Sequence, residues 1–152
     1  MGYTTEFTGE FKLNKKLDKE THEFLVKFNE TRRMARNLDP KYGVEGEFFV
    51  GGKGYMGHDE DDTVIDSNRP PKTQPSLWCQ WRPNEDGTAI EWDDVEKFYY
   101  YVEWIEYLIE TIFKPREYSL TGNVRWSGEE FMDIGTIVIK DNDVQVIHGQ
   151  YV

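Results

Sequence analysis

The segment from Trp92 to Phe113 places the strongest constraint on how this chain folds. Its apolar residues recur at spacings of three and four, which is the period of an amphipathic helix. These residues are Val95, Phe98, Val102, Ile105, Ile109 and Ile112. Asp93 and Asp94 can accept hydrogen bonds from the first turn, and Pro115 cannot continue the helix. The pattern predicts a helix of about six turns, long enough to cross a small domain.

Apolar and polar residues alternate elsewhere in the chain, which is typical of half-buried strands. The predicted strands are Tyr3–Leu13, Gly46–Val50, Leu77–Arg82, Thr88–Trp92, Tyr118–Trp126, Ile134–Lys140 and Val144–His148. Asp86-Gly87 and Asp141-Asn142-Asp143 predict hairpin turns between strands. A first helix is predicted from an N-cap at Asp18 to about Asn37.

The predicted order of elements is β-α-β-β-β-α-β-β-β, which indicates an α+β fold. A mostly antiparallel sheet with two helices packed on it is the natural arrangement for this order. Residues 51–76 are rich in Gly, Pro and Asp and form a long connection, either functional or mobile. Too few residues precede this loop for an independent core, so we expect a single domain over residues 1–152.

The formal net charge is −11 at pH 7 and is unevenly distributed. Residues 1–41 hold nine Lys and Arg against seven Asp and Glu, a net of +2. Residues 42–152 hold nine against twenty-two, a net of −13. Such an acidic surface repels nucleic acid and anionic membranes and favours basic partners. The other explanation is that negative charge keeps a small protein soluble.

Cysteine content and the N-terminus bear on the compartment. Cys79 is the only cysteine, which excludes an intramolecular disulfide and favours a reducing compartment. The N-terminal residues lack the basic and apolar regions of a signal peptide, and no run of about eighteen apolar residues occurs. We therefore expect a cytoplasmic protein, either encoded by the cell in which it acts or carried inside a virus-infected cell.

Large aromatic and acidic residues share one side of the predicted 92–113 helix. Tyr100, Trp104 and Tyr107 project away from the apolar stripe, among Glu96, Glu103 and Glu110. One interpretation is that a loop covers these aromatics, which would then belong to the core. The functional interpretation is an exposed aromatic surface with an acidic rim that binds a partner protein.

A second set of residues predicts a pocket for a small anionic ligand. Arg32, Arg33 and Arg82 can form charged hydrogen bonds to phosphate or carboxylate groups. Glu91 or Asp93 would then transfer protons, in a pocket between loop 51–76 and hairpin 77–92. The alternative for Arg32 and Arg33 is that they complement the dipole at the end of the first helix.

Other motifs lack the context that their chemistry requires. Gly52–Gly57 matches G-x-G-x-x-G, but acidic residues follow it instead of a helix, so we expect no dinucleotide cofactor. His58–Asp62 and Asp66 can gather around a hard cation, although a solvated acidic loop is the better interpretation, so we expect no metal. Cys79 lies between tryptophans, as a buried inert thiol does, and no motif of nucleophilic catalysis occurs. We assign no catalytic residue.

Six segments are distinctive in their sequence: GYTTEF near the N-terminus, TRRM at 31–34, YGVEGE at 42–47, QPSLWCQW at 74–81, EDGTAIEWD at 85–93 and YVEWIEYLI at 101–109. In these segments the chain resembles a family of small acidic proteins of bacteria and phages. The resemblance covers most of the chain and implies a single intact domain. It carries over no catalytic residue.

Two functions are compatible with these patterns. The first is a non-catalytic protein that binds a partner protein through its acidic surface and exposed aromatics. A phage or mobile-element inhibitor of a host nucleic-acid-binding protein fits, because clustered carboxylates can imitate phosphate charge. The second is a small-ligand-binding protein or enzyme that uses the arginine pocket. Neither direct nucleic-acid binding nor membrane binding is expected.

Overall fold

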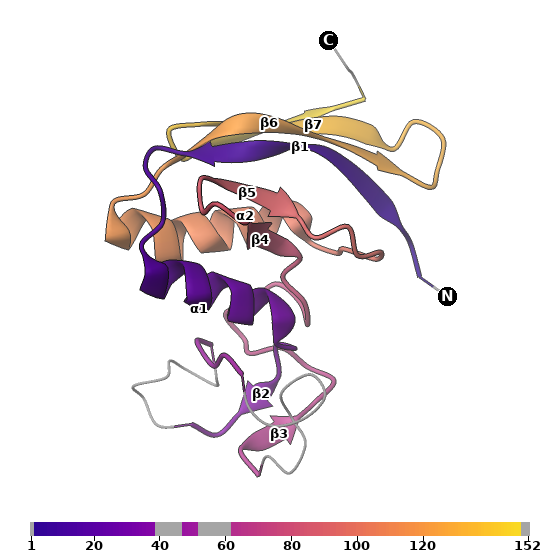
Figure 1. Cartoon of the computed structure of the whole chain (residues 1–152). Coiled ribbons are helices and arrows are strands. Elements are labelled where there is room, and N and C mark those ends of the chain that lie inside the picture. The colour runs from indigo at the N-terminus through magenta and orange to yellow at the C-terminus, as the bar shows by residue number, and fades with distance from the viewer. Residues whose placement is uncertain (1, 39–46, 52–61, 150–152) are drawn as a thin grey trace. The chain divides into compact units, whose positions relative to one another are not determined.

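The computed structural model describes residues 2–38, 47–51 and 62–149 (Figure 1). Those residues form two α-helices and eight strands, and every strand pairing is antiparallel. The α+β fold with a mostly antiparallel sheet is therefore confirmed. Two compact units make up the chain. The first comprises residues 1–18 and 80–152, and the second comprises residues 19–79.

A six-stranded sheet in the order β4-β5-β1-β6-β7-β8 forms the centre of the first unit. Its strands are β1 (Thr5–Leu13), β4 (Trp81–Pro83), β5 (Ala89–Trp92), β6 (Leu120–Gly128), β7 (Ile134–Lys140) and β8 (Asp143–His148). The long strands β1 and β6 pair over their whole length, from Thr5 opposite Gly128 to Leu13 opposite Leu120. The alternation of apolar and polar residues in β1 and β6 favours this register, because it gives each strand one apolar side.

Helix α2 (Tyr101–Leu108) lies against one face of this sheet (Figure 1). It continues into a π-helical segment, η4 (Ile109–Phe113), and a 3-10 turn, η5 (Lys114–Arg116). Apolar side chains of both layers are buried in this unit: Phe7, Phe11, Val124, Trp126, Ile137 and Ile139 from the sheet, and Ile105, Leu108, Ile109 and Ile112 from the helical segment. Thr8, Asn123 and Arg125 point to the opposite face, which remains exposed.

Both predicted hairpin turns are present. Gly87 has a φ of 72° in the β4–β5 turn, where the Asn84 side chain accepts hydrogen bonds from the N–H groups of Thr88 and Ala89. Asp141 (φ 48°) and Asn142 (φ 70°) form the two-residue β7–β8 turn. Positive φ at both central residues defines a type I′ turn, which matches the twist of the paired strands.

The second unit contains α1 (Lys19–Glu30) and a two-stranded sheet of β2 (Ala35–Arg36) and β3 (Val64–Asp66). Helix α1 begins directly after Asp18, as predicted, but it ends at Glu30 and not near Asn37. The chain after it turns into β2, which the sequence patterns did not predict. The reason is the pairing of β2 with β3, which lies about thirty residues further along the chain.

The predicted helix from Trp92 to Phe113 is wrong over its first half, because α2 begins only at Tyr101. Asp94, Lys97 and Tyr100 have φ values of 63°, 64° and 58°, so the backbone before α2 cannot be helical. Asp93 and Asp94 therefore do not cap this helix. At the other end, the α-helix finishes at Leu108, the π-helical segment reaches Phe113, where the predicted helix ends, and a 3-10 turn continues through Pro115.

Tertiary contacts explain the late start of α2. The Gln80 side chain donates hydrogen bonds to the carbonyl oxygens of Glu96 (3.3 Å) and Lys97 (3.4 Å), and Trp92 donates one to Val95 (3.1 Å). Phe98 is buried, with its ring 5.2 Å from that of Trp81. These contacts fix residues 92–98 in an irregular conformation that overrides their helical period.

Two further strand predictions are wrong in part. Residues 47–50 of the predicted strand Gly46–Val50 form a turn and an irregular segment, and Gly46 lies outside the described residues. Residues 77–80 are irregular too, so β4 covers only Trp81–Pro83. In the second unit, the Arg33 backbone N–H donates to the Leu77 carbonyl oxygen (2.6 Å), which replaces strand pairing there.

Candidate functional site

The outer side of α2 and of the π-helical segment η4 that continues it carries three carboxylates and a tyrosine, which we call the α2 acidic face: Glu103, Glu106 and Tyr107 from α2, and Glu110 from η4. Spacings of three and four residues bring these side chains to one side of the helix. All three glutamates are exposed and Tyr107 is half-buried. The Tyr107 ring contacts the Trp104 ring edge-to-face, with 5.5 Å between centroids. The aromatic ring is thus held in place among the carboxylates.

Trp104 does not belong to this face, which corrects the predicted partner surface. Its side chain is 0% exposed, because it lies on the side of α2 that also carries Ile105 and Leu108. Tyr100 is 57% exposed and precedes the helix. Of the three predicted aromatics, only Tyr100 and Tyr107 therefore reach the surface.

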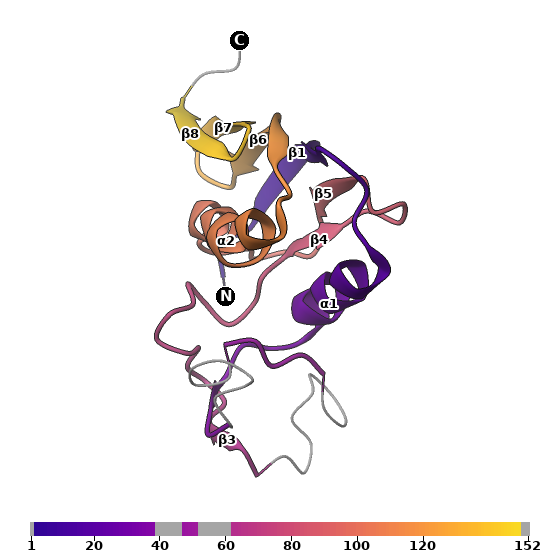
Figure 2. The same cartoon turned by 90° about the vertical axis from the view of Figure 1, so that its left-hand side faces the viewer.

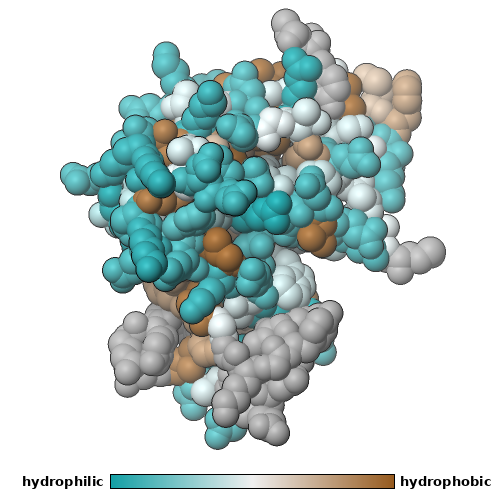
Figure 3. All heavy atoms as spheres, in the orientation of Figure 1, coloured by the Kyte–Doolittle hydropathy of each residue, from teal (hydrophilic) through white to brown (hydrophobic). Residues whose placement is uncertain are grey.

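Electrostatics of the α2 acidic face is dominated by its glutamates. Lys114 pairs with Glu110 at 2.6 Å, and Lys97 pairs with Glu96 at 3.9 Å. Both pairs are exposed, so each adds little to stability. Glu106 was missed by the sequence analysis, although its position three residues after Glu103 and four before Glu110 was a usable signal. In the view of Figure 3, hydrophilic side chains cover most of the described surface.

Arg33 holds the second unit together and is not exposed to a ligand. Its side chain is 1% exposed and donates hydrogen bonds to the carbonyl oxygens of Glu47 and Phe49, both at 2.8 Å, and to the Gln74 side chain at 2.9 Å. Its guanidinium also lies over the Phe28 ring, 4.1 Å from the centroid. The predicted anion-binding role of Arg33 is therefore wrong.

The other members of the predicted anion pocket belong to different units of the chain. Arg32 donates a hydrogen bond to the Ser67 carbonyl oxygen (2.9 Å) within the second unit. Arg82 and Glu91 belong to the first unit, where they face each other on β4 and β5 and pair at 3.4 Å. Asp93 accepts a hydrogen bond from the Val95 N–H (2.9 Å). Within the first unit, Arg82 and Glu91 thus form an ordinary cross-strand ion pair.

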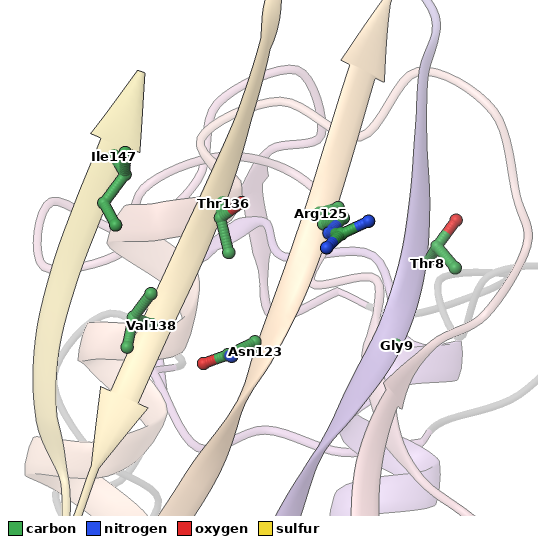
Figure 4. A pocket seen from close by; sticks show the side chains of 7 residues that line it. All are labelled: Thr8, Gly9, Asn123, Arg125, Thr136, Val138 and Ile147. Atoms are coloured by element: carbon green, nitrogen blue, oxygen red, sulfur yellow. The ribbon is translucent and has the colours of Figure 1, made fainter. Parts of the chain in front are cut away.

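A shallow hollow of about 370 Å³ lies on the exposed face of the sheet, across β1, β6, β7 and β8 (Figure 4). It is lined by Thr8, Gly9, Asn123, Arg125, Thr136, Val138 and Ile147. Strand register explains the arrangement, because Thr8, Arg125, Thr136 and Ile147 are successive partners across the four strands. Arg125 already has an interaction within the described chain, so the hollow does not offer an unpaired cation.

Asp133 is the centre of a polar network at one end of the sheet in the first unit. Its carboxylate accepts hydrogen bonds from the Tyr3 hydroxyl (2.5 Å) and the Trp126 indole N–H (3.0 Å). The bond to Asp133 raises the pKa of the Tyr3 hydroxyl. Burial, with the nearby Asp133 charge, raises the pKa of Tyr101 to about 12. Both hydroxyls therefore remain protonated at physiological pH.

Several sequence predictions fall on residues outside the described ranges. All of the G-x-G-x-x-G match at 52–57 lies there, as does the acidic run from His58 to Asp61. The described residues contain no group of three or more His, Cys, Asp or Glu side chains able to hold a metal ion. Cys79 is buried and not in a disulfide, as predicted, although it precedes β4 and does not lie within a strand.

Comparisons with known proteins give no further information about the site. No family model matches the chain, and searches of curated proteins and of solved structures find no match. Among the helices of the described residues, none has the length and apolar character needed to cross a membrane.

Proposed function

We propose that the protein is a non-catalytic binding protein and that the α2 acidic face binds a basic surface of a partner protein. The observation that carries the proposal is the position of Glu103, Glu106 and Glu110 beside Tyr107 on the exposed side of one helix. Tyr100, at the start of the same helix, extends the aromatic part of this surface.

The chemistry of the face suits a partner that is rich in Lys or Arg. Neighbouring carboxylates on the helix are about 5–6 Å apart, within the Debye length of about 8 Å at physiological salt, so the fields of neighbours add. Tyrosine contributes a rigid ring and a polar hydroxyl, which makes it a frequent centre of binding energy in interfaces. A net charge of −11 adds long-range attraction and accelerates association with a basic partner.

Nucleic-acid-binding proteins are the partner class that this charge favours. Their binding surfaces are lined with Lys and Arg that contact phosphates, and a row of carboxylates can occupy such a surface. A phage or mobile-element inhibitor of a host protein belongs to this class. The single cysteine, buried and not in a disulfide, is in keeping with action in the cytoplasm.

The proposal is tested by capture from lysate with two variants of equal charge. Glu103→Gln/Glu106→Gln/Glu110→Gln neutralises the α2 acidic face. Glu20→Gln/Glu23→Gln/Glu30→Gln neutralises three exposed glutamates of α1 and is the matched control. We expect a protein that wild type and the α1 variant both retain and that the α2 variant loses.

Two further measurements complete the test: the salt dependence of retention and competition by nucleic acid. Retention should weaken as salt rises, because the attraction is between exposed charges. Duplex DNA or RNA should compete with wild type for the captured protein if that protein's nucleic-acid-binding surface is the target. A partner that both triple variants retain equally would show that α2 is not the binding surface.

A further inference from the structure

Strand β8 forms one edge of the six-stranded sheet, and among the described residues no strand pairs with it on its outer side (Figure 2). An edge strand presents unpaired backbone N–H and C=O groups that can pair with another chain. The type and number of these groups follow from the way β8 pairs with β7.

The pairing with β7 decides which β8 residues face outward. The Gly149 N–H donates to the Ile134 carbonyl oxygen at 2.8 Å, so this residue pair is hydrogen-bonded. Hydrogen-bonded and non-bonded pairs alternate along an antiparallel ladder. Ile147, Gln145 and Asp143 therefore bond to β7, opposite Thr136, Val138 and Lys140. By the same alternation, Val144, Val146 and His148 direct their N–H and C=O groups away from β7.

Strand β4, at the opposite edge of the sheet, carries features that prevent pairing with another chain, and the residues of β8 lack them. Strand β4 is only three residues long and ends in Pro83, which has no N–H to donate. Strand β8 has six residues, DVQVIH, with no proline, no lysine and no glycine. Natural edge strands usually carry such devices against pairing, so their absence from β8 indicates an edge that is used.

We propose that β8 pairs antiparallel with β8 of a second copy of this chain, about a two-fold axis at Val146. Such an axis places Val146 opposite Val146 of the partner subunit, and Val144 opposite the partner's His148. Each of these residues directs its backbone groups outward, so three pairs on the ladder are hydrogen-bonded in one register. A register shifted by a single residue would pair outward-facing residues with inward-facing ones and lose these bonds.

The side chains of β8 are compatible with pairing to their own copy. Val144 to His148 includes no Asp, Glu, Lys or Arg, so no like charges lie opposite each other despite the net charge of −11. Val146 gains an apolar neighbour in the partner's Val146. Ile147, which is 42% exposed, lies opposite the partner's Gln145 on the other face of the sheet. Closed two-fold symmetry limits the assembly to a dimer.

The variant Val146→Pro tests the pairing of two copies separately from the folding of one copy. The Val146 N–H faces away from β7, so Val146→Pro removes a donor that only the second copy would use. Val146→Thr keeps both the N–H and the side-chain shape and is the matched control. In light scattering at about 0.15 M salt, wild type and Val146→Thr should have twice the monomer mass of 18.0 kDa. Val146→Pro should have the monomer mass. Its urea midpoint should equal that of wild type diluted until wild type is monomeric, because pairing of two copies stabilises only the folded state.

Disulfide trapping tests the register. Two Val146→Cys chains would place their Cα atoms about 5.5 Å apart, within the range for a disulfide. Gln145→Cys is the control, because it lies opposite the partner's Ile147 and not opposite itself. We expect oxidation to convert Val146→Cys to a covalent dimer and to leave Gln145→Cys monomeric.

A monomeric wild type, or equal trapping of both cysteine variants, would overturn the proposal. So would a dimer that Val146→Pro leaves intact. The dimer does not depend on the α2 acidic face, so partner capture and dimerisation can fail separately.

Discussion

At the scale of single residues, Tyr101 shows how strongly its surroundings change an ordinary side chain. Its ring contacts those of Phe7 (4.9 Å) and Trp126 (5.7 Å) within the first unit. Burial among these rings raises the pKa of its hydroxyl from 10.0 to about 12. The charged form is disfavoured because the rings replace the water that would solvate it.

This shift predicts a loss of stability at high pH. The unfolded chain releases the Tyr101 proton near pH 10 and the folded chain holds it to about pH 12, so the free energy of unfolding falls between these values. Urea unfolding at about pH 9 and about pH 11 measures the loss. Tyr101→Phe should lose less than wild type over this interval. An equal loss in both proteins would assign it to other groups, such as Tyr3.

Trp104 and Arg33 show which residue properties the sequence leaves open. The sequence left two interpretations open for Trp104, the core and an exposed partner-binding surface, and the structure places its side chain in the core. The rotation of the helix places Trp104 inside, because the helix buries Ile105 and Leu108 beside it. Arg33 is buried since its guanidinium satisfies backbone carbonyl oxygens of residues 47 and 49. Neither outcome can be predicted from local patterns.

At the scale of elements, the segment before α2 is the main departure from the local sequence pattern. Three residues with left-handed backbone angles, Asp94, Lys97 and Tyr100, recur at intervals of three before the helix. None is glycine, and the left-handed region costs a residue with a Cβ atom roughly 1–2 kcal/mol. The buried Phe98 and the bonds from Gln80 maintain this conformation.

Glycine substitutions at two adjacent exposed positions test the strain in this segment. Lys97→Gly relieves the left-handed angle, so this variant should be at least as stable as wild type to urea. Glu96→Gly is the matched control, because it breaks the same exposed ion pair at a residue without positive φ. We expect it to cost about 1 kcal/mol. If both variants lose equal stability, Lys97 is not strained.

At the scale of the whole molecule, the two compact units raise the question of how the chain unfolds. The sequence predicts one domain over residues 1–152, and this remains a prediction. Every hydrogen bond described here for the Arg33 side chain lies within residues 19–79. Losing them leaves partly buried carbonyl oxygens without these donors, which costs about 1–3 kcal/mol.

Arg33→Met tests this question, and hydrogen exchange is the measurement. We expect amides of residues 31–38 and 62–79 to lose protection, while those of β6 and β7 keep theirs, because local stability follows local bonding. Gln145→Met, at an exposed position of β8, is the control and should leave both regions unchanged. Equal loss of protection in β6 and β7 would show that the chain unfolds as one cooperative domain.

The sequence by itself determined the α+β class, the strands β1, β6, β7 and β8, and both hairpin turns. These features follow from period-two alternation and from Gly87, Asp141 and Asn142, which act within a few residues of each other. Only the tertiary structure decided the start of α2, the burial of Trp104 and Arg33, and the pairing of β2 with β3. Those features depend on hydrogen bonds and packing between residues far apart in the chain, which no local period encodes.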